Sequence, residues 1–421
     1  MIINTQKMGF SYFSSPNYLV SQQLNAWIPS LEKWGASYVV YQANFDVAVP
    51  EDAFQCAQDH GLESIVHFKT TLPSAKTFNE ASLMLDIYKK WGCQFVILGD
   101  QPNTKKTWPI ANWHYETLVD RFIDRFIPLA YHAVRIGLNP ILAPLHPGGD
   151  YWDCAFLEQL LIGLNQRKMK CILENLTFAS YGYTFQKPLY WGSGGPQQWP
   201  GSKPYETPEG QEDQIGFNNF EWVQAVGERI TGLKKPVLIL DAGRPSHAFE
   251  QLYAENAMDT IKKIAIACRN TKPDESVDDI LNPTFNDLVL GCTFSLDTLR
   301  ALMGDHFSKG AMEEIFSINQ RSEEKTIVFD GNQKYLAHYL LLPSYESGVS
   351  DVVLNKVRPL IKKLHPTMGF SLEEASHAEK VSVFPDPYLF KEQQINQLRS
   401  AGCEVEILPD SGIEIATRLQ S

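Results

Sequence analysis

The sequence lacks the features that mark several large classes of protein. It contains no run of lysines and arginines that could neutralise a phosphate backbone, and its formal net charge is −12, so we expect neither nucleic acid nor an anionic membrane as a partner. No stretch of about eighteen apolar residues occurs, which excludes a membrane-spanning helix. The seven cysteines are scattered and show no C-x-x-C spacing, which favours free thiols in a reducing compartment.

Motifs for cofactors and for export are also missing. No Gly-x-Ser-x-Gly elbow, Walker loop or dinucleotide fingerprint occurs, so we expect no cofactor. His67, His146, Glu174 and Asp241 could converge on a metal, but no local ligand spacing supports this, and we expect no metal site. Residues 1–7 lack the apolar core of a secretory signal, so we expect a cytoplasmic chain, or a surface or extracellular one if a leader was removed.

Short apolar runs rich in strand-forming residues recur along the first three quarters of the chain, with helical patterns between them. These runs are Met8–Phe13, Tyr38–Phe45, Ser64–Lys69, Phe95–Gly99, Pro140–Leu145, Cys171–Asn175, Pro236–Asp241 and Leu288–Phe294. An open doubly wound sheet would usually carry a glycine-rich loop after its first strand, and none is present. The pattern therefore predicts a (β/α)8 TIM barrel over residues 1–320.

A second domain is predicted over residues 325–421, after the charged segment 320–325. Strand and helix patterns alternate through it, and Gly402 has the position of a helix stop. The expected strands are Tyr335–Leu342, Thr367–Phe370, Val381–Phe384 and Glu404–Leu408, with helices near Val352–Leu364, Leu372–Ala378 and Phe390–Ala401 and a closing helix. This order predicts a small C-terminal parallel α/β domain.

The loop after the expected sixth strand, about Leu176–Gly216, is far longer than the two to six residues usual in such units. It is rich in aromatic residues, which disordered segments lack, so we expect it to be ordered. Its aromatic residues include Tyr181, Tyr183, Phe185, Tyr190, Trp191, Trp199 and Tyr205. They could form platforms for the C–H faces of sugar rings, or simply pack as a lid on the barrel rim.

Two short motifs suggest the chemistry of the barrel. The fourth expected strand runs into Gly99-Asp100-Gln101-Pro102-Asn103, and the seventh into Leu240-Asp241-Ala242-Gly243. These motifs resemble the strand ends of the clan A glycoside hydrolases, retaining enzymes whose fourth strand ends Gly-Asn-Glu-Pro-Asn and whose seventh ends in patterns such as Thr-Glu-Phe-Gly. The resemblance spans about residues 8–300 and implies a site at the C-terminal mouth of the barrel.

The resemblance also implies altered catalysis. The clan's acid/base Glu is replaced by Gln101, and an amide has no proton that titrates near neutral pH. The nucleophile Glu is replaced by Asp241, which is one methylene shorter. General acid–base help is worth roughly 10²- to 10⁴-fold in rate, so the loss of the acid is the more serious change.

Three other carboxylates could replace the missing acid. Glu174 is expected to end the sixth strand, where it would act as acid, contact the ligand or form a buried ion pair with Arg244. Asp100 could instead accept hydrogen bonds from loop N–H groups, and Asp150 could either reach the mouth or cap the following helix. His67, Lys69, His146, Arg244 and His247 are also expected at the mouth, where Arg244, Asp100 and Asp150 would contact the ligand.

Three functions remain open from the sequence. In the first, the barrel binds a carbohydrate or glycan-like ligand without standard retaining catalysis, through Gln101, Asn103, Asp241 and Glu174, with Trp152, Trp191 and Trp199 stacking on the sugar. In the second, Asp241 as nucleophile or base and Glu174 as acid form an active glycosidase. In the third, a surface or assembly protein uses the barrel only as a scaffold.

Overall fold

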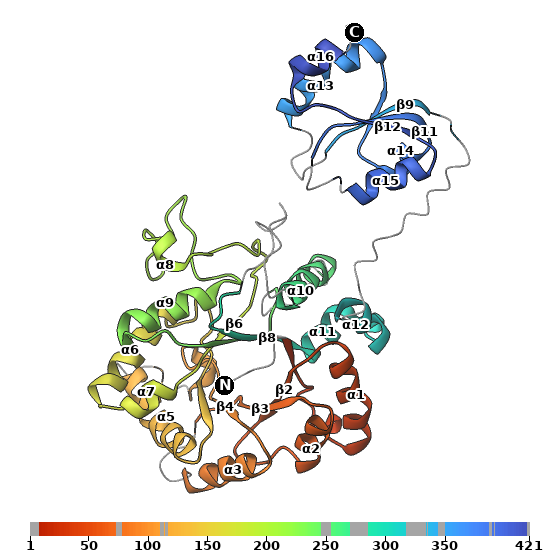
Figure 1. The fold of residues 1–421 in the computed structure, drawn as a ribbon. Coiled ribbons are helices and arrows are strands. Elements are labelled where there is room, and N and C mark those ends of the chain that lie inside the picture. The colour runs from red at the N-terminus through yellow and green to blue at the C-terminus, as the bar shows by residue number, and fades with distance from the viewer. Residues whose placement is uncertain are drawn as a thin grey trace. The chain divides into compact units, whose positions relative to one another are not determined.

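The computed structural model describes residues 8–72, 78–109, 113, 117–245, 254–269, 285–316, 334, 336–343, 350–386, 390 and 392–418. Contacts divide the chain into two compact units, Met1–Gln320 and Arg321–Ser421. The first unit is a barrel of eight parallel strands with helices around its outside (Figure 1), which confirms the predicted TIM barrel. No helix among the described residues has the length and apolar content needed to cross a membrane.

The strands of the barrel are short and almost completely buried. They are β1 (Met8–Ser11), β2 (Tyr38–Ala43), β3 (Glu63–Phe68), β4 (Phe95–Leu98), β5 (Asn139–Leu142), β6 (Phe178–Tyr181), β7 (Val237–Leu240) and β8 (Val289–Ser295). Along each strand, alternate side chains face the barrel interior or the surrounding helices. Val40, Ile97 and Leu240 belong to the interior cluster, while Val39, Val96 and Ile239 pack outward against the helices.

The helices of the first unit are α1 (Ser21–Lys33), α2 (Glu51–Asp59), α3 (Phe78–Lys90), α5 (Leu118–Arg135), α6 (Asp153–Gln166), α7 (Lys170–Asn175), α8 (Gly195–Gln198), α9 (Asn219–Thr231), α10 (Ala254–Arg269), α11 (Leu296–Met303) and α12 (Lys309–Phe316), with 3-10 turns at Pro16–Tyr18, Lys105–Thr107 and Gly304–His306. After α1 and α3 the chain turns through Gly35 and Gly92, both at positive φ, and then enters a buried strand. The lack of a Cβ makes this left-handed conformation cheap, so these glycines stop the helices as expected.

The prediction of a strand at Cys171–Asn175 is wrong. Those residues form α7, in which Lys170 and Glu174 make an i,i+4 ion pair and the Asn175 amide donates to the Cys171 carbonyl. The sixth strand is β6, inside the segment expected to be loop, and it pairs in parallel with β7. A short apolar run fits helix and strand equally well, and pairing with a neighbouring strand decided between them.

The ring of strands has one seam. Ladder hydrogen bonds connect the order β5-β4-β3-β2-β1-β8-β7-β6, whereas β5 and β6 meet through the isolated bridges Ile141↔Thr177 and Leu145↔Ser180. Buried side chains brace the seam from outside. Asp153, at the start of α6, accepts hydrogen bonds from Gln214 (2.7 Å) and from Asn219 (2.9 Å), at the start of α9.

The second unit is a four-stranded parallel sheet in the order β10-β9-β11-β12, which confirms the small C-terminal α/β domain. Its strands are β9 (Leu336–Leu341), β10 (Thr367–Gly369), β11 (Ala378–Val383) and β12 (Glu404–Ile407), and its helices are α13 (Asp351–Leu364), α14 (Leu372–Ser376), α15 (Glu392–Ser400) and α16 (Gly412–Arg418). Each face has its own apolar cluster, with Tyr339 and Leu398 in one and Leu340 and Val357 in the other. The unit therefore contains a core separate from that of the barrel.

Candidate functional site

The end of β4 carries a buried carboxamide in an unusual backbone conformation. Gln101 has φ +45° and is only 3% exposed. Its Nε2 donates to the hydroxyl of Tyr183 at 3.4 Å, and its Oε1 is buried with no hydrogen-bond partner among the described residues. Native proteins pair most buried polar atoms, so an unmatched acceptor at a barrel mouth suggests a group that awaits a ligand.

The end of β7 repeats the same conformation with a carboxylate. Asp241 has φ +48° and is 4% exposed, and its Oδ2 lies 3.3 Å from Nη1 of Arg244. Both strand-end residues lie at the carboxyl ends of parallel strands and hence at the same end of the barrel. A non-glycine residue in this region costs roughly 1–3 kcal/mol, and such strain concentrates at functional sites.

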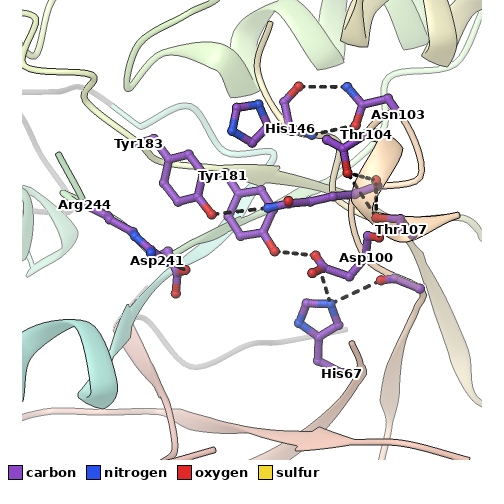
Figure 2. Close-up of polar contacts among 12 residues, drawn as sticks. His67, Asp100, Asn103, Thr104, Thr107, His146, Tyr181, Tyr183, Asp241 and Arg244 are labelled. Atoms are coloured by element: carbon purple, nitrogen blue, oxygen red, sulfur yellow. Dashed lines mark hydrogen bonds and ion pairs between the residues drawn. The ribbon is translucent and has the colours of Figure 1, made fainter. Parts of the chain in front are cut away.

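Asp100, Tyr181 and His67 form a second polar group at this mouth (Figure 2). The hydroxyl of Tyr181 donates a short hydrogen bond to Oδ1 of Asp100, and Nε2 of His67 lies 3.9 Å from the same oxygen and 3.2 Å from the Gly99 carbonyl. Among the described residues, the contacts of the Asp100 carboxylate come from side chains of β3 and β6 and not from the loop N–H groups that were expected. Its side chain remains 23% exposed and accessible to a ligand.

Burial sets the protonation states of the groups around Asp100. It lowers the pKa of His67 to about 3, with a smaller effect of the Lys69 charge in the same direction, so the imidazole is neutral at physiological pH and donates from Nε2–H to Gly99. Burial also raises the pKa of Tyr181 and of Tyr183 well above 10, and the negative charges of Asp100 and Asp241 add to this. Both phenols therefore stay protonated as hydrogen-bond donors.

The aromatic rings of β6 and its loop pack on one another rather than forming an open platform. Tyr181 and Tyr183 stack with ring centres 4.6 Å apart, and Arg244 lies over the Tyr183 ring at 5.5 Å. His146, after β5, and Phe185 both pack against Tyr183 with ring centres about 6 Å away. A ligand would therefore meet mainly the polar edges of this cluster.

Glu174 does not lie at the mouth. It belongs to α7, before β6 begins; its side chain is 53% exposed, its carboxylate pairs with Lys170, and its carbonyl accepts from Lys235, which precedes β7. These contacts place it at the amino-terminal end of the strands, opposite Asp241. The expected roles of Glu174 as catalytic acid and as partner of Arg244 are therefore wrong, and Arg244 pairs with Asp241 instead.

Two other predicted ligand contacts are engaged in holding loops. The Asn103 side chain is fully buried; Nδ2 donates to the carbonyls of His146 and Tyr151, and Oδ1 accepts from the His146 N–H. Asp150 accepts from the Lys105 N–H at 2.9 Å and does not cap α6, whose first flanking residue is Trp152. Both residues shape the mouth by tying the β4 and β5 loops together. His247 lies outside the described residues.

The three tryptophans expected to stack on sugar belong to the internal packing of the loops. Trp152 is 7% exposed and packs against Tyr205, and the indole of Trp199 donates to the Ser193 carbonyl. The indole of Trp191 donates to Asp213, which also accepts from Lys187 and Thr207. Residues 182–218 thus form an ordered loop, which is closed by Asp213 and its three donors. We call Lys187, Trp191, Thr207 and Asp213 the Asp213 clasp.

Tyr181 and Tyr183 contact the site residues Asp100 and Gln101, a role that the sequence had not indicated. They were expected only as loop aromatics, although the alternation Ala179, Tyr181, Tyr183 has the period of two expected of a strand that faces a barrel interior. Among the described residues, no group of three His, Cys, Asp or Glu side chains could hold a metal ion. The polar groups at the mouth are the Gln101 carboxamide, the Asp100 carboxylate and the Asp241–Arg244 pair.

No family model and no curated protein matches the chain. Solved structures with some similarity include the tandem GH20 catalytic modules in the pneumococcal exo-β-D-N-acetylglucosaminidase StrH, with TM-score 0.38 and 10% identity over 72% of this chain and 85% of that one. Another is D-allulose 3-epimerase from Methylomonas sp., with TM-score 0.30 and 13% identity over 57% of this chain and 86% of that one. Similarity at this level does not indicate a shared site.

Proposed function

We propose that this chain is a glycoside-hydrolase-like barrel protein that binds a carbohydrate or glycan-like ligand at the C-terminal mouth and does not carry out standard retaining hydrolysis. The observation that supports this most directly is the pair Gln101 and Asp241. Both are buried, both have left-handed backbone, and both occupy strand ends where the resembled enzymes carry their two glutamates. Only one of the two can ionise.

The arrangement of the other groups agrees with binding better than with acid catalysis. Glu174, the carboxylate best suited to replace the acid, lies at the far end of the barrel. Oδ2 of Asp241 lies 3.3 Å from Nη1 of Arg244, and a carboxylate oxygen fixed in this way suits a hydrogen-bond acceptor. Gln101, Asp100 and Asp241 thus supply acceptors for hydroxyl groups, and the stacked Tyr181 and Tyr183 rings pack beside them.

Binding can be tested by calorimetry against a panel of oligosaccharides, with Asp241→Asn as the site variant. We expect measurable affinity for at least one sugar and a loss of about tenfold to a hundredfold in Asp241→Asn, because the change removes a charged acceptor and leaves Arg244 without its carboxylate. Glu174→Gln, which alters a carboxylate at the other end of the barrel, is the control and should bind like the parent. If no sugar bound, the use of the barrel as a scaffold would be favoured.

Catalysis can be tested with aryl glycosides. The parent chain is expected to give no turnover above background, whereas Gln101→Glu restores a titratable group at the acid/base position and should raise turnover by up to about 10²- to 10⁴-fold. Asp241→Asn in the Gln101→Glu background should abolish the gain. Turnover by the parent that survives in Asp241→Asn would show a different catalytic apparatus and contradict the proposal.

A further inference from the structure

We infer that the mouth selects an uncharged sugar that presents a hydroxyl donor to the carboxamide oxygen of Gln101, and that it discriminates against sugars that carry a carboxylate. The inference rests on the proposed function, because it names the chemical class of the ligand bound at the same site. The Oε1 atom of Gln101 is buried and has no hydrogen-bond partner among the described residues.

The backbone around Gln101 holds the carboxamide in place. Its N–H donates to the Pro144 carbonyl at 2.9 Å, and its carbonyl accepts from the hydroxyls of Thr104 and Thr107, both at 2.9 Å. Its Nε2 donates to Tyr183, so the oxygen is the end of the amide left for a ligand. An amide oxygen can only accept, and the complementary ligand group must therefore be a donor such as a hydroxyl.

The charges near Gln101 also favour a ligand without a carboxylate. The adjacent Asp100 has a partly exposed carboxylate and accepts a hydrogen bond from Tyr181. The cation of Arg244 lies against the Asp241 carboxylate, and His67 is neutral. The charges of Lys69 and Lys106 act on His67 and His146 respectively. A sugar carboxylate placed at Gln101 would face acceptors and meet the repulsion of Asp100.

A mismatch of this kind has a measurable cost. A buried acceptor that loses its donor, or that is forced against another acceptor, weakens binding by about tenfold to a hundredfold. Sites built around one hydrogen bond to a substrate hydroxyl discriminate strongly against analogues that lack it. The hydroxyl facing Gln101 is therefore expected to be a main determinant of specificity.

The experiment is calorimetry with matched oligosaccharides of glucose, mannose and galactose and with the corresponding uronic acids. The parent chain should bind at least one neutral sugar at least tenfold more tightly than its uronate, and Gln101→Met, which keeps side-chain length but removes the acceptor, should lose about tenfold or more of that affinity. Gln55→Met, on the outer helix α2, is the control for the substitution. Circular dichroism checks that each variant is folded.

The outcomes separate the inference from the proposed function. Tighter binding of a uronate would show that Gln101 presents its N–H to the ligand and would overturn the inference while leaving carbohydrate binding intact. Undiminished binding by folded Gln101→Met would also overturn it. No binding of any sugar would refute the proposed function itself. If Gln101→Met fails to fold, Gln101→Glu decides, measured with thio-linked sugars that resist cleavage. A carboxylate oxygen still accepts from a sugar hydroxyl, so the neutral sugar should stay bound, whereas loss of its binding would show that the N–H end of Gln101 faces the ligand and would overturn the inference.

Discussion

At residues 101 and 241 an unusual backbone conformation directs a polar side chain toward the mouth of the barrel. Each residue has a positive φ, which costs roughly 1–3 kcal/mol for a non-glycine residue. Hydrogen bonds of the neighbouring backbone hold each residue in this conformation. At Gln101 these bonds involve Pro144 and the two threonines, and beyond Asp241 the Ala242 N–H donates to the Thr293 carbonyl. The surrounding barrel therefore holds both side chains toward the site.

His67 should make the stability of the chain dependent on pH. Its folded pKa, lowered by burial to about 3, lies below its ordinary value near 6.5. In the window between these values the unfolded chain binds a proton at this residue and the folded chain does not. Stability is therefore full above about pH 6.5 and falls as the pH is lowered, by at most about 1.4 kcal/mol per pH unit from this one residue.

The His67→Gln variant checks this effect because glutamine can still donate to the Gly99 carbonyl and does not titrate. Urea unfolding at several pH values between 4.5 and 7 should show a shallower dependence in the variant than in the parent. Parallel dependences in the two chains would contradict a buried, neutral His67.

At the scale of elements, most of the barrel could be predicted from the sequence because its strands are buried apolar runs. The sixth could not, since Cys171, Ile172 and Leu173 form an apolar run that fits α7, while β6 begins at Phe178 and contains Ala179 and Ser180. The error displaced the expected active site. It placed Glu174 at the mouth and left Tyr181 and Tyr183 in a loop, because no local pattern reveals which segment pairs with β7.

The site was predictable only where it follows directly from strand ends. Gln101, Asp241, His67 and Arg244 lie at the mouth because β3, β4 and β7 were located correctly. The partners of Asp100 depend on contacts across the barrel, which a single sequence does not contain. The same holds for the Trp side chains, whose hydrogen bonds within the loop emerge only from its folding.

The Asp213 clasp should control the long loop of residues 182–218. Burial raises the pKa of Asp213, but the hydrogen bonds from Lys187, Trp191 and Thr207 outweigh this and hold it below its ordinary value. Its contribution is present above about pH 4 and is lost as the pH falls through the folded pKa. We expect Asp213→Asn to destabilise the loop by about 1.5–3 kcal/mol, because three charge-assisted hydrogen bonds are weakened.

Limited proteolysis of the loop would measure this change. Asp213→Asn should speed cleavage, whereas Glu209→Gln, an exposed substitution in the same loop, should behave like the parent. Unchanged cleavage in Asp213→Asn would show that the loop is held by other contacts.

At the scale of the whole molecule, the two units have separate cores and should respond separately to core damage. Leu160, in α6, and Leu398, in α15, are both fully buried. Truncation of either to alanine should cost about 2–5 kcal/mol through lost burial and the cavity left behind. In scanning calorimetry, we expect Leu160→Ala to lower only the barrel transition and Leu398→Ala only that of the second unit. A single transition shifted by both would show that the units unfold together.

The seam between β5 and β6 bears on how the mouth could change its width. A closed barrel widens most easily where the hydrogen bonding between neighbouring strands is weakest. Between β5 and β6 two isolated bridges replace a continuous ladder, and the second bridge immediately precedes His146 and Tyr181 in the chain. Stiffness at that point comes from the contacts of Asp153 with Gln214 and Asn219, outside the ring. A ligand could thus be accommodated by a small outward movement of the barrel between β5 and β6. The hydrogen bonds between the starts of α6 and α9 would then restore the original width.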